Sequence, residues 1–241
     1  GRPDAMLLAR LDPNEKKVTL LSIPRDTYVP IADTQHWDKI NHAYLRGISA
    51  VVKTVENFFG VPVDHYVLLN MEGFVKLVDA LDGIRVNVEK PIISRVEPYV
   101  RLQAGQQLLN GKEALAYVRF RSDAENDYGR QRRQREVILA VLSRVEQLGI
   151  RQMPQIIEVI RALGPNLKTD LTMLEVIHLA ADFHSLSGKD VNIIQIKSRP
   201  SKIRGKWVVL IEQSERERIA RALSQPEKQV HCKKLIKKMQ L

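Results

Sequence analysis

Residues 6–27 read MLLARLDPNEKKVTLLSIPRDT. Met6–Leu11 and Val18–Ile23 are short apolar runs, and the residues that join them, Asp12-Pro-Asn-Glu-Lys-Lys, have the chemistry of a turn. The pattern predicts a β-hairpin. Its second run ends directly in Pro24-Arg25-Asp26-Thr27, and a charged pair after a buried strand is a common place for site residues in α/β folds.

Helical and strand-like patterns alternate through the rest of the chain. Apolar positions recur at helical spacing from Ile40 to Phe59, and Gly60 ends this pattern. Between Pro91 and Gly111 the pattern is weak. We therefore expect one α/β domain over residues 1–223, followed by a basic tail at 224–241. The remaining predicted elements are strand Val63–Leu69, helix Met71–Leu81, strand Ile84–Val88, helices Gly111–Tyr117, Asp127–Leu148, Met153–Leu163 and Leu171–Phe183, strands Val191–Ile196 and Trp207–Ile211, and helix Ser214–Leu223.

The charge balance points to an acidic partner. The 241 residues carry a formal net charge of +10, which fits nucleic acid, an anionic membrane surface or an anionic substrate. Aromatic residues make up only 5% and do not interleave with the basic stretches, which argues against single-stranded nucleic acid. The single cysteine, Cys232, excludes an internal disulfide and a Cys-based zinc site.

A second informative stretch, residues 117–136, reads YVRFRSDAENDYGRQRRQRE and holds six arginines but no lysine. Planar, bidentate guanidinium groups suit phosphate or carboxylate oxygens. If Tyr117–Arg121 is extended, Arg119 and Arg121 point to the same side; a helix from Asp127 puts Arg130 and Gln134 on one face. An anion site and a surface network of ion pairs with the interleaved acids both remain open.

Three motifs together resemble the LytR-CpsA-Psr family: GRPDAMLLARLDP, LLSIPRDTYVPI and YVRFRSDAENDYGRQRRQ. The order of KINHAY, HYVLLNMEGFVKLVDALDGIRVNV and LNGKEALAYVR between them is similar too. The resemblance covers Gly1–Leu223. It implies a single α-β-α layered domain with a central mixed β-sheet flanked by helices.

The resemblance also implies a function. Members of this family are membrane-anchored, extracytoplasmic enzymes of mainly Gram-positive bacteria. They attach anionic glycopolymers, such as wall teichoic acid or capsular polysaccharide, from a polyprenyl pyrophosphate carrier to a muramic acid hydroxyl of peptidoglycan, assisted by Mg²⁺. The carrier's polyprenyl chain lies in an apolar groove between the sheet and the helices. The chain opens Gly-Arg-Pro-Asp without a Met, so we expect the family's membrane helix and a second metal-binding Asp to precede it.

Carried over by motif, the resemblance assigns residues to this site. Catalysis would fall to Arg25, Arg119, Arg121 and Arg130, which with Arg2 and Gln134 would bind the pyrophosphate. Asp4 would be the magnesium ligand, and Asp26 and Asp127 would orient neighbouring arginines rather than act as bases. The six histidines share no spacing that suggests a triad or a metal site.

Two other functions compete with this transferase. A nucleic-acid-binding regulator would also suit a basic chain, but no helix-turn-helix pair is visible and the arginines interleave with acids. A non-catalytic binder of polyprenyl-linked glycans would use the same arginines without transfer. We expect the lipid-linked glycopolymer and peptidoglycan, not nucleic acid, to be the partners.

Overall fold

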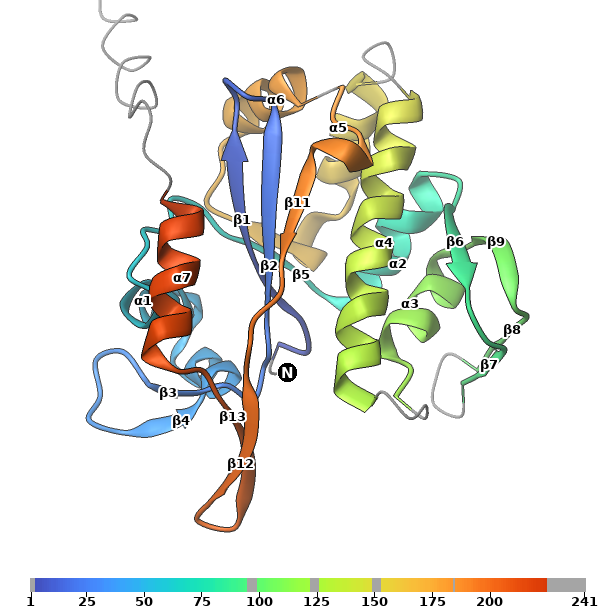
Figure 1. Cartoon of the computed structure of the whole chain (residues 1–241). Coiled ribbons are helices and arrows are strands. Elements are labelled where there is room, and N and C mark those ends of the chain that lie inside the picture. Colours follow the sequence, from blue (N-terminus) through green and yellow to red (C-terminus); the bar gives the residue numbers. More distant parts are fainter. Residues whose placement is uncertain (1–2, 95–98, 122–125, 149–152, 184, 225–241) are drawn as a thin grey trace, which may run out of the picture.

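The computed structural model describes residues 3–94, 99–121, 126–148, 153–183 and 185–224 (Figure 1). The predicted hairpin is confirmed: β1 (Met6–Asp12) and β2 (Lys17–Ile23) are antiparallel, with Met6 opposite Ile23. On the other side of β2, β11 (Val191–Ile194) runs parallel to it. The result is a three-stranded mixed sheet in the order β1-β2-β11.

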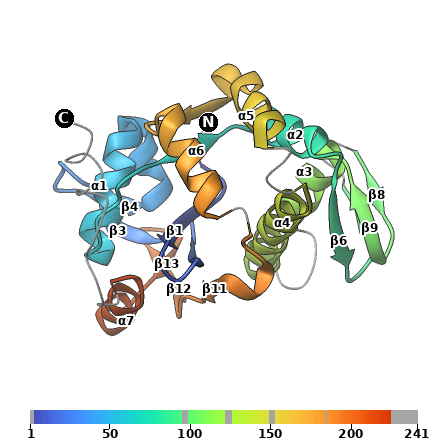
Figure 2. The ribbon, with the colours of Figure 1, turned by 90° about the horizontal axis from the view of Figure 1, so that it is seen from above.

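Helices surround this sheet, which confirms the layered α/β prediction. Figure 2 shows α5 (Met153–Ala162) and α6 (Met173–Asp182) along one side, with α4 (Asn126–Leu148) and α7 (Gln213–Leu223) on the others. Thr172 caps α6 through a capping box with Glu175, so the helix begins two residues after the predicted Leu171. The core beside β2 takes its apolar side chains from α1, α7 and β11 as well.

The prediction of a single helix over Ile40–Phe59 is wrong. The chain forms a 3-10 helix η1 (Ile40–Arg46) and then α1 (Ile48–Phe59), separated by Gly47. Gly47 has a φ of 99°, a backbone conformation that side chains disfavour, and this changes the chain direction between the two segments. Apolar spacing continues across the break, which is why periodicity alone suggested one helix.

The other strands form short pairs. The strand predicted over Val63–Leu69 is confined to Val67–Leu69, and the weakly patterned region after Pro91 contains three strands that the sequence did not reveal. The pairs are β3 (Tyr28–Pro30) with β4 (Trp37–Lys39), β5 (Val67–Leu69) with β10 (Leu167–Thr169), β6 (Ile84–Val88) with β9 (Gly105–Leu109), β7 (Ile92–Ile93) with β8 (Arg101–Leu102), and β12 (Arg199–Ile203) with β13 (Lys206–Leu210).

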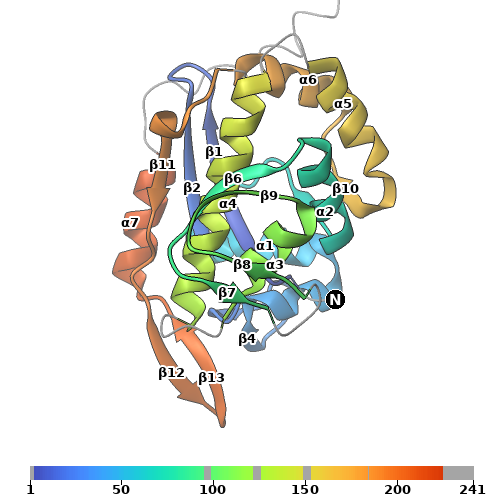
Figure 3. The ribbon, with the colours of Figure 1, turned by 90° about the vertical axis from the view of Figure 1, so that its right-hand side faces the viewer.

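A second core lies under the β6–β9 hairpin, which Figure 3 shows on the side of the molecule that faces the viewer. Here α2 (Met71–Ala80), α3 (Gly111–Arg119) and α4 bury apolar side chains together. Gly111 begins α3 against the backbone of Val75, where the space excludes a side chain. Within the described ranges, none of the helices combines the length and apolarity needed to cross a bilayer.

Candidate functional site

The turn after β2 is held rigidly by distant parts of the chain. Thr27 is fully buried, and its hydroxyl donates to the main-chain oxygen of Pro24 at 2.6 Å. The amide of Val209 on β13 donates to the oxygen of Asp26 at 2.9 Å, and that of Asn41 to the oxygen of Arg25 at 3.2 Å. Because the backbone's polar groups are satisfied in this way, the Arg25 side chain starts from a fixed position.

Arg25 forms an ion pair with Asp4, so the structure brings two predicted site residues together from the start of β1 and the end of β2. Arg25 Nε is buried and has no hydrogen-bond partner among the described residues; Asp26 Oδ2 lies 3.9 Å away. Asp26 contacts Lys39 more closely, at 2.8 Å. Sequence reasoning missed Lys39, although the KINHAY motif contains it.

The helix predicted over Gly111–Tyr117 is confirmed as α3 and runs on to Arg119, so Tyr117–Arg121 is not extended throughout, the condition under which Arg119 and Arg121 would point to the same side. A capping box between Asn110 and Glu113 starts α3, and the helix continues to Arg119. Tyr117 anchors this last turn, because its ring is buried and its hydroxyl donates to Glu136 at 2.6 Å. The backbone becomes extended only at Phe120.

The helix predicted from Asp127 is confirmed as α4, which begins at Asn126. Arg130 and Arg133, one turn apart, are each only 4% exposed, and Gln134 is half-buried. Arg133 donates to the main-chain oxygen of Phe120 at 2.7 Å and its guanidinium lies 5.3 Å from the centre of that ring. This contact joins α4 to the segment that carries Arg119 and Arg121, a role that helix periodicity did not indicate.

The predicted site residues lie on four segments: the start of β1, the end of β2, the end of α3 and the start of α4. Figure 1 shows all four in its lower half. Arg119 is half-buried and Arg121 exposed there. Arg2 and the side chain of Asp127 lie outside the described residues. The arrangement offers several fixed cations to an anion arriving at this end.

The alternative of a surface ion-pair network applies to part of the arginine stretch. Arg132 lies 2.8 Å from Glu89 and 3.0 Å from Glu136. Such partly exposed pairs contribute about 0–1 kcal/mol each to stability. Arg130 and Arg133, by contrast, are almost removed from water, where a guanidinium is costly unless charge or hydrogen bonds compensate it.

The described residues fit a magnesium ion only in a limited way. They contain no group of three or more His, Cys, Asp or Glu side chains able to hold a metal. Asp4 can supply one carboxylate, but its ion pair with Arg25 would have to open. Mg²⁺ commonly uses one or two carboxylates and completes its shell with water and substrate phosphates, so Asp4 suits an ion held mainly by substrate.

Fold and candidate site together describe an α/β protein whose predicted site residues are mainly arginines. The chain belongs to the LytR_cpsA_psr family, whose profile matches residues 1–225. It is 39% identical over 191 residues to the polyisoprenyl-teichoic acid–peptidoglycan teichoic acid transferase TagU of Enterococcus faecalis. That match takes in 78% of this chain and 61% of the relative, so the chain spans less than two thirds of that protein.

Solved structures show the same fold. The crystal structure of Bacillus subtilis TagV superposes with a TM-score of 0.83 at 29% identity, over 92% of this chain and 88% of that one. The structure of TagT bound to LIIa-WTA superposes with a TM-score of 0.80 at 32% identity, over 92% of this chain and 84% of that one. The mixed α/β architecture is therefore that of the family.

Proposed function

We propose that this domain transfers an anionic cell-wall glycopolymer from a polyprenyl pyrophosphate carrier to peptidoglycan. The observation that carries the proposal is that Arg25, the Arg119–Arg121 segment and Arg130 belong to chain segments at the same end of a domain of this family. Its relatives named as teichoic acid transferases support the reaction class. Because the carrier is bound to the membrane and the acceptor is peptidoglycan, the proposal includes a location at the outer face of the cell membrane of a Gram-positive-type bacterium.

The arginines have a defined task in such a transfer. The acceptor hydroxyl attacks the phosphorus that bears the glycopolymer, a new P–O bond forms, and the bond to the bridging oxygen breaks, releasing polyprenyl phosphate. The hydroxyl proton leaves to solvent or to a base that we do not assign. Negative charge grows on the leaving phosphate, and each preorganised cation or donor stabilises that charge by about 2–4 kcal/mol.

The fixed backbone around these arginines is what makes the stabilisation effective. Arg25 leaves a turn bonded to β13 and η1, and Arg133 holds the segment between Arg119 and Arg121 against α4. Donors held before the substrate arrives need no reorganisation as charge develops. A Mg²⁺ at Asp4 would supply further neutralisation of phosphate charge.

The carrier's lipid requires an apolar surface. The exposed large apolar side chains include Leu7 and Leu11 on β1 and Leu174 and Ile177 on α6. Contiguous apolar surface of this kind marks binding sites, whereas single exposed apolar residues are ordinary. We assign these four to contact with the polyprenyl chain.

Calorimetric titration with a short-chain polyprenyl pyrophosphate tests the proposal. We expect micromolar binding to the parent, roughly tenfold weaker binding to Arg119→Ala, a loss of about 1.4 kcal/mol, and no change in Arg85→Ala, which alters an exposed arginine on β6. Transfer of labelled glycopolymer to peptidoglycan then separates an enzyme from a non-catalytic binder. Equal carrier binding by the parent and Arg119→Ala would refute the role of Arg119 in binding the pyrophosphate.

The nucleic-acid alternative has its own readout. Binding through phosphate contacts falls steeply as salt rises. Salt-dependent DNA binding by the domain, with no binding of the carrier, would favour a regulator over a transferase.

A further inference from the structure

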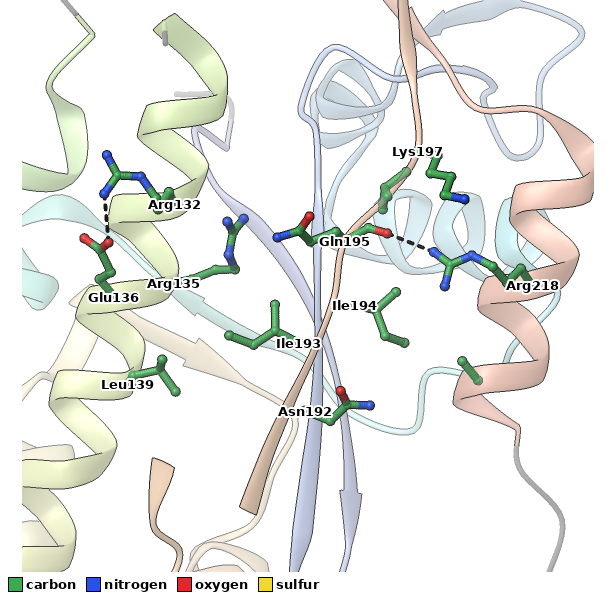
Figure 4. A pocket seen from close by; sticks show the side chains of 12 residues that line it. Arg132, Arg135, Glu136, Leu139, Asn192, Ile193, Ile194, Gln195, Lys197 and Arg218 are labelled. Atoms are coloured by element: carbon green, nitrogen blue, oxygen red, sulfur yellow. Dashed lines mark hydrogen bonds and ion pairs between the residues drawn. The ribbon is translucent and has the colours of Figure 1, made fainter. Parts of the chain in front are cut away.

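A pocket of about 750 Å³ lies between α4 and α7, along β11 (Figure 4). Its lining includes none of the residues proposed to bind the pyrophosphate. Arg135, which lines it, follows Arg130 by five positions, which is roughly 140° around the axis of an α-helix. The pocket therefore opens on a different face of α4. Its lining comprises Arg132, Arg135, Glu136 and Leu139 of α4, residues 192–197, and Arg218 and Ala222 of α7.

The charges of this pocket are unbalanced. Four cationic side chains line it, Arg132, Arg135, Lys197 and Arg218, against the single carboxylate of Glu136. Two of the cations have close acidic partners: Arg132 binds Glu136, and Arg218 binds Glu215 at 2.7 Å while also donating to the main-chain oxygen of Gln195 at 2.8 Å.

Arg135 and Lys197 are in a different situation. Within the described ranges, neither side chain makes a hydrogen bond or a close ion pair, although both line the pocket. Figure 4 shows Arg135 extending from α4 toward β11, and Lys197 beyond β11 on the side of α7, with Gln195 between them. The two charges therefore lie on either side of β11 along the same pocket.

The surroundings of Arg135 favour the binding of an anion beside its guanidinium. Burial lowers the pKa of its guanidinium, Glu136 raises it, and Arg132 lowers it again. A cation partly withdrawn from water interacts more strongly with an anion than an exposed one does. Leu139 and Ile193 add apolar surface beside it, a combination typical of sites for small organic anions.

We infer that this pocket is a second anion-binding site, which holds a phosphate-bearing segment of the glycopolymer away from the reacting pyrophosphate. The inference rests on the proposed function. The planar fork of Arg135 suits two oxygens of one phosphate, and Lys197, beyond β11, acts as a point charge for another phosphate of the same chain. Cations on both sides of the pocket suit a chain with repeated charge better than a single terminal carboxylate.

The test uses a short glycerol phosphate oligomer, titrated calorimetrically into the domain. The double variant Arg135→Gln/Lys197→Gln should bind it roughly tenfold more weakly than the parent. Lys202→Gln, which removes an exposed cation of the β12–β13 hairpin, is the matched control and should bind as the parent does. Thermal unfolding of each variant checks that the fold is intact.

Three further results decide the assignment. Arg119→Ala, the variant with weakened carrier binding, should still bind the oligomer, because Arg119 lies outside the pocket. Complete loss of oligomer binding by Arg119→Ala would overturn the second site and leave the proposed function standing. Unchanged binding by the double variant would also overturn it, as would preference for a peptidoglycan stem peptide over the oligomer. Oligomer binding by a parent that fails to bind the carrier would overturn the proposed function instead.

Discussion

The Arg133 side chain donates to the main-chain oxygen of Phe120 at 2.7 Å and stacks over the ring of the same residue. Phe120 stands between Arg119 and Arg121, the two arginines proposed to grip the carrier. A helix residue that is itself almost fully buried therefore fixes the position of two others. Arg133 is a positioning residue rather than a catalytic one.

Replacing Arg133 by Lys should weaken carrier binding roughly tenfold. An ammonium has no planar group to lie over the Phe120 ring while it donates a hydrogen bond to the Phe120 main-chain oxygen. Calorimetry measures the affinity, and KM and kcat should change together because both arginines are displaced. Arg132→Lys, one position earlier and paired with the partly exposed Glu89 and Glu136, is the control and should leave binding unchanged. Parent-like affinity in Arg133→Lys would contradict this role.

Gly111→Ala should destabilise the domain by about 1–3 kcal/mol, because the new methyl group would meet the backbone of Val75. Gly188 is a matched control: a Cβ added there has no atom within 4 Å, and Gly188→Ala should be near neutral. Denaturant unfolding compares the two. Equal stability of both variants would show that α2 and α3 can move apart easily.

Tyr117→Phe removes the hydroxyl that donates to Glu136 while keeping the buried ring. We expect a loss of about 1.5–3 kcal/mol in the free energy of unfolding, the usual net contribution of a hydrogen bond to a charged group. Tyr99, whose side chain is largely exposed, gives the control substitution Tyr99→Phe, for which no loss is expected. A loss of equal size in both variants would contradict a stabilising contribution of the Tyr117–Glu136 hydrogen bond.

Glu215 gives a prediction for acid stability. Hydrogen bonds from Arg218 lower the pKa of its carboxyl group, burial opposes this, and the amide of Lys197 adds to the lowering. Because the folded pKa lies below the unfolded one, the carboxylate stabilises the fold fully above the unfolded value of about 4.3. That contribution is lost as the pH falls through the lower, folded pKa.

Glu215→Gln should therefore cost about 1–3 kcal/mol at neutral pH, and the difference from the parent should shrink on acidification. Urea unfolding as a function of pH measures it. A difference that stays constant from neutral pH down to well below the unfolded pKa would contradict the linkage.

The role of Asp4 can be separated from that of Arg25 by magnesium. If Asp4 is a ligand, Mg²⁺ should strengthen carrier binding in the parent and have no effect in Asp4→Asn, since an amide is a weaker ligand for a hard cation. Without Mg²⁺ the variant should bind at least as well as the parent, because Arg25 is released from its ion pair. Asp33→Asn, at an exposed acid paired with Lys53, controls for charge. An undiminished magnesium effect in Asp4→Asn would exclude the assignment.

Local patterns predicted the parts of the fold that local chemistry determines. The β1–β2 hairpin, α4 and the capped α6 agree with their turn residues, apolar spacing and capping signals. The short pairs β3–β4 and β7–β8 carry no such pattern, because their strands are stabilised by tertiary contacts rather than by alternation of apolar residues. The break at Gly47 depends on a backbone angle that apolar spacing does not encode.

The site shows the same division. The motifs assigned arginines to the site, an assignment that stays a prediction, and the structure pairs two of the assigned residues, Asp4 and Arg25. The supporting contacts, Lys39 with Asp26 and Arg133 with Phe120, join segments that periodicity treats separately. The helical state of Tyr117–Arg119 depended on the burial of Tyr117, which sequence spacing did not reveal.

The parallel pairing of β11 with β2 determines when the domain can finish folding. Val18 lies opposite Val191, so the central sheet stays incomplete until almost the whole domain has been synthesised. Until then β2 has an open edge, and unpaired edges recruit other chains. Contacts this distant in sequence also slow folding. A fragment that ends before residue 191 should therefore be prone to aggregation, however well its hairpin and helices form on their own.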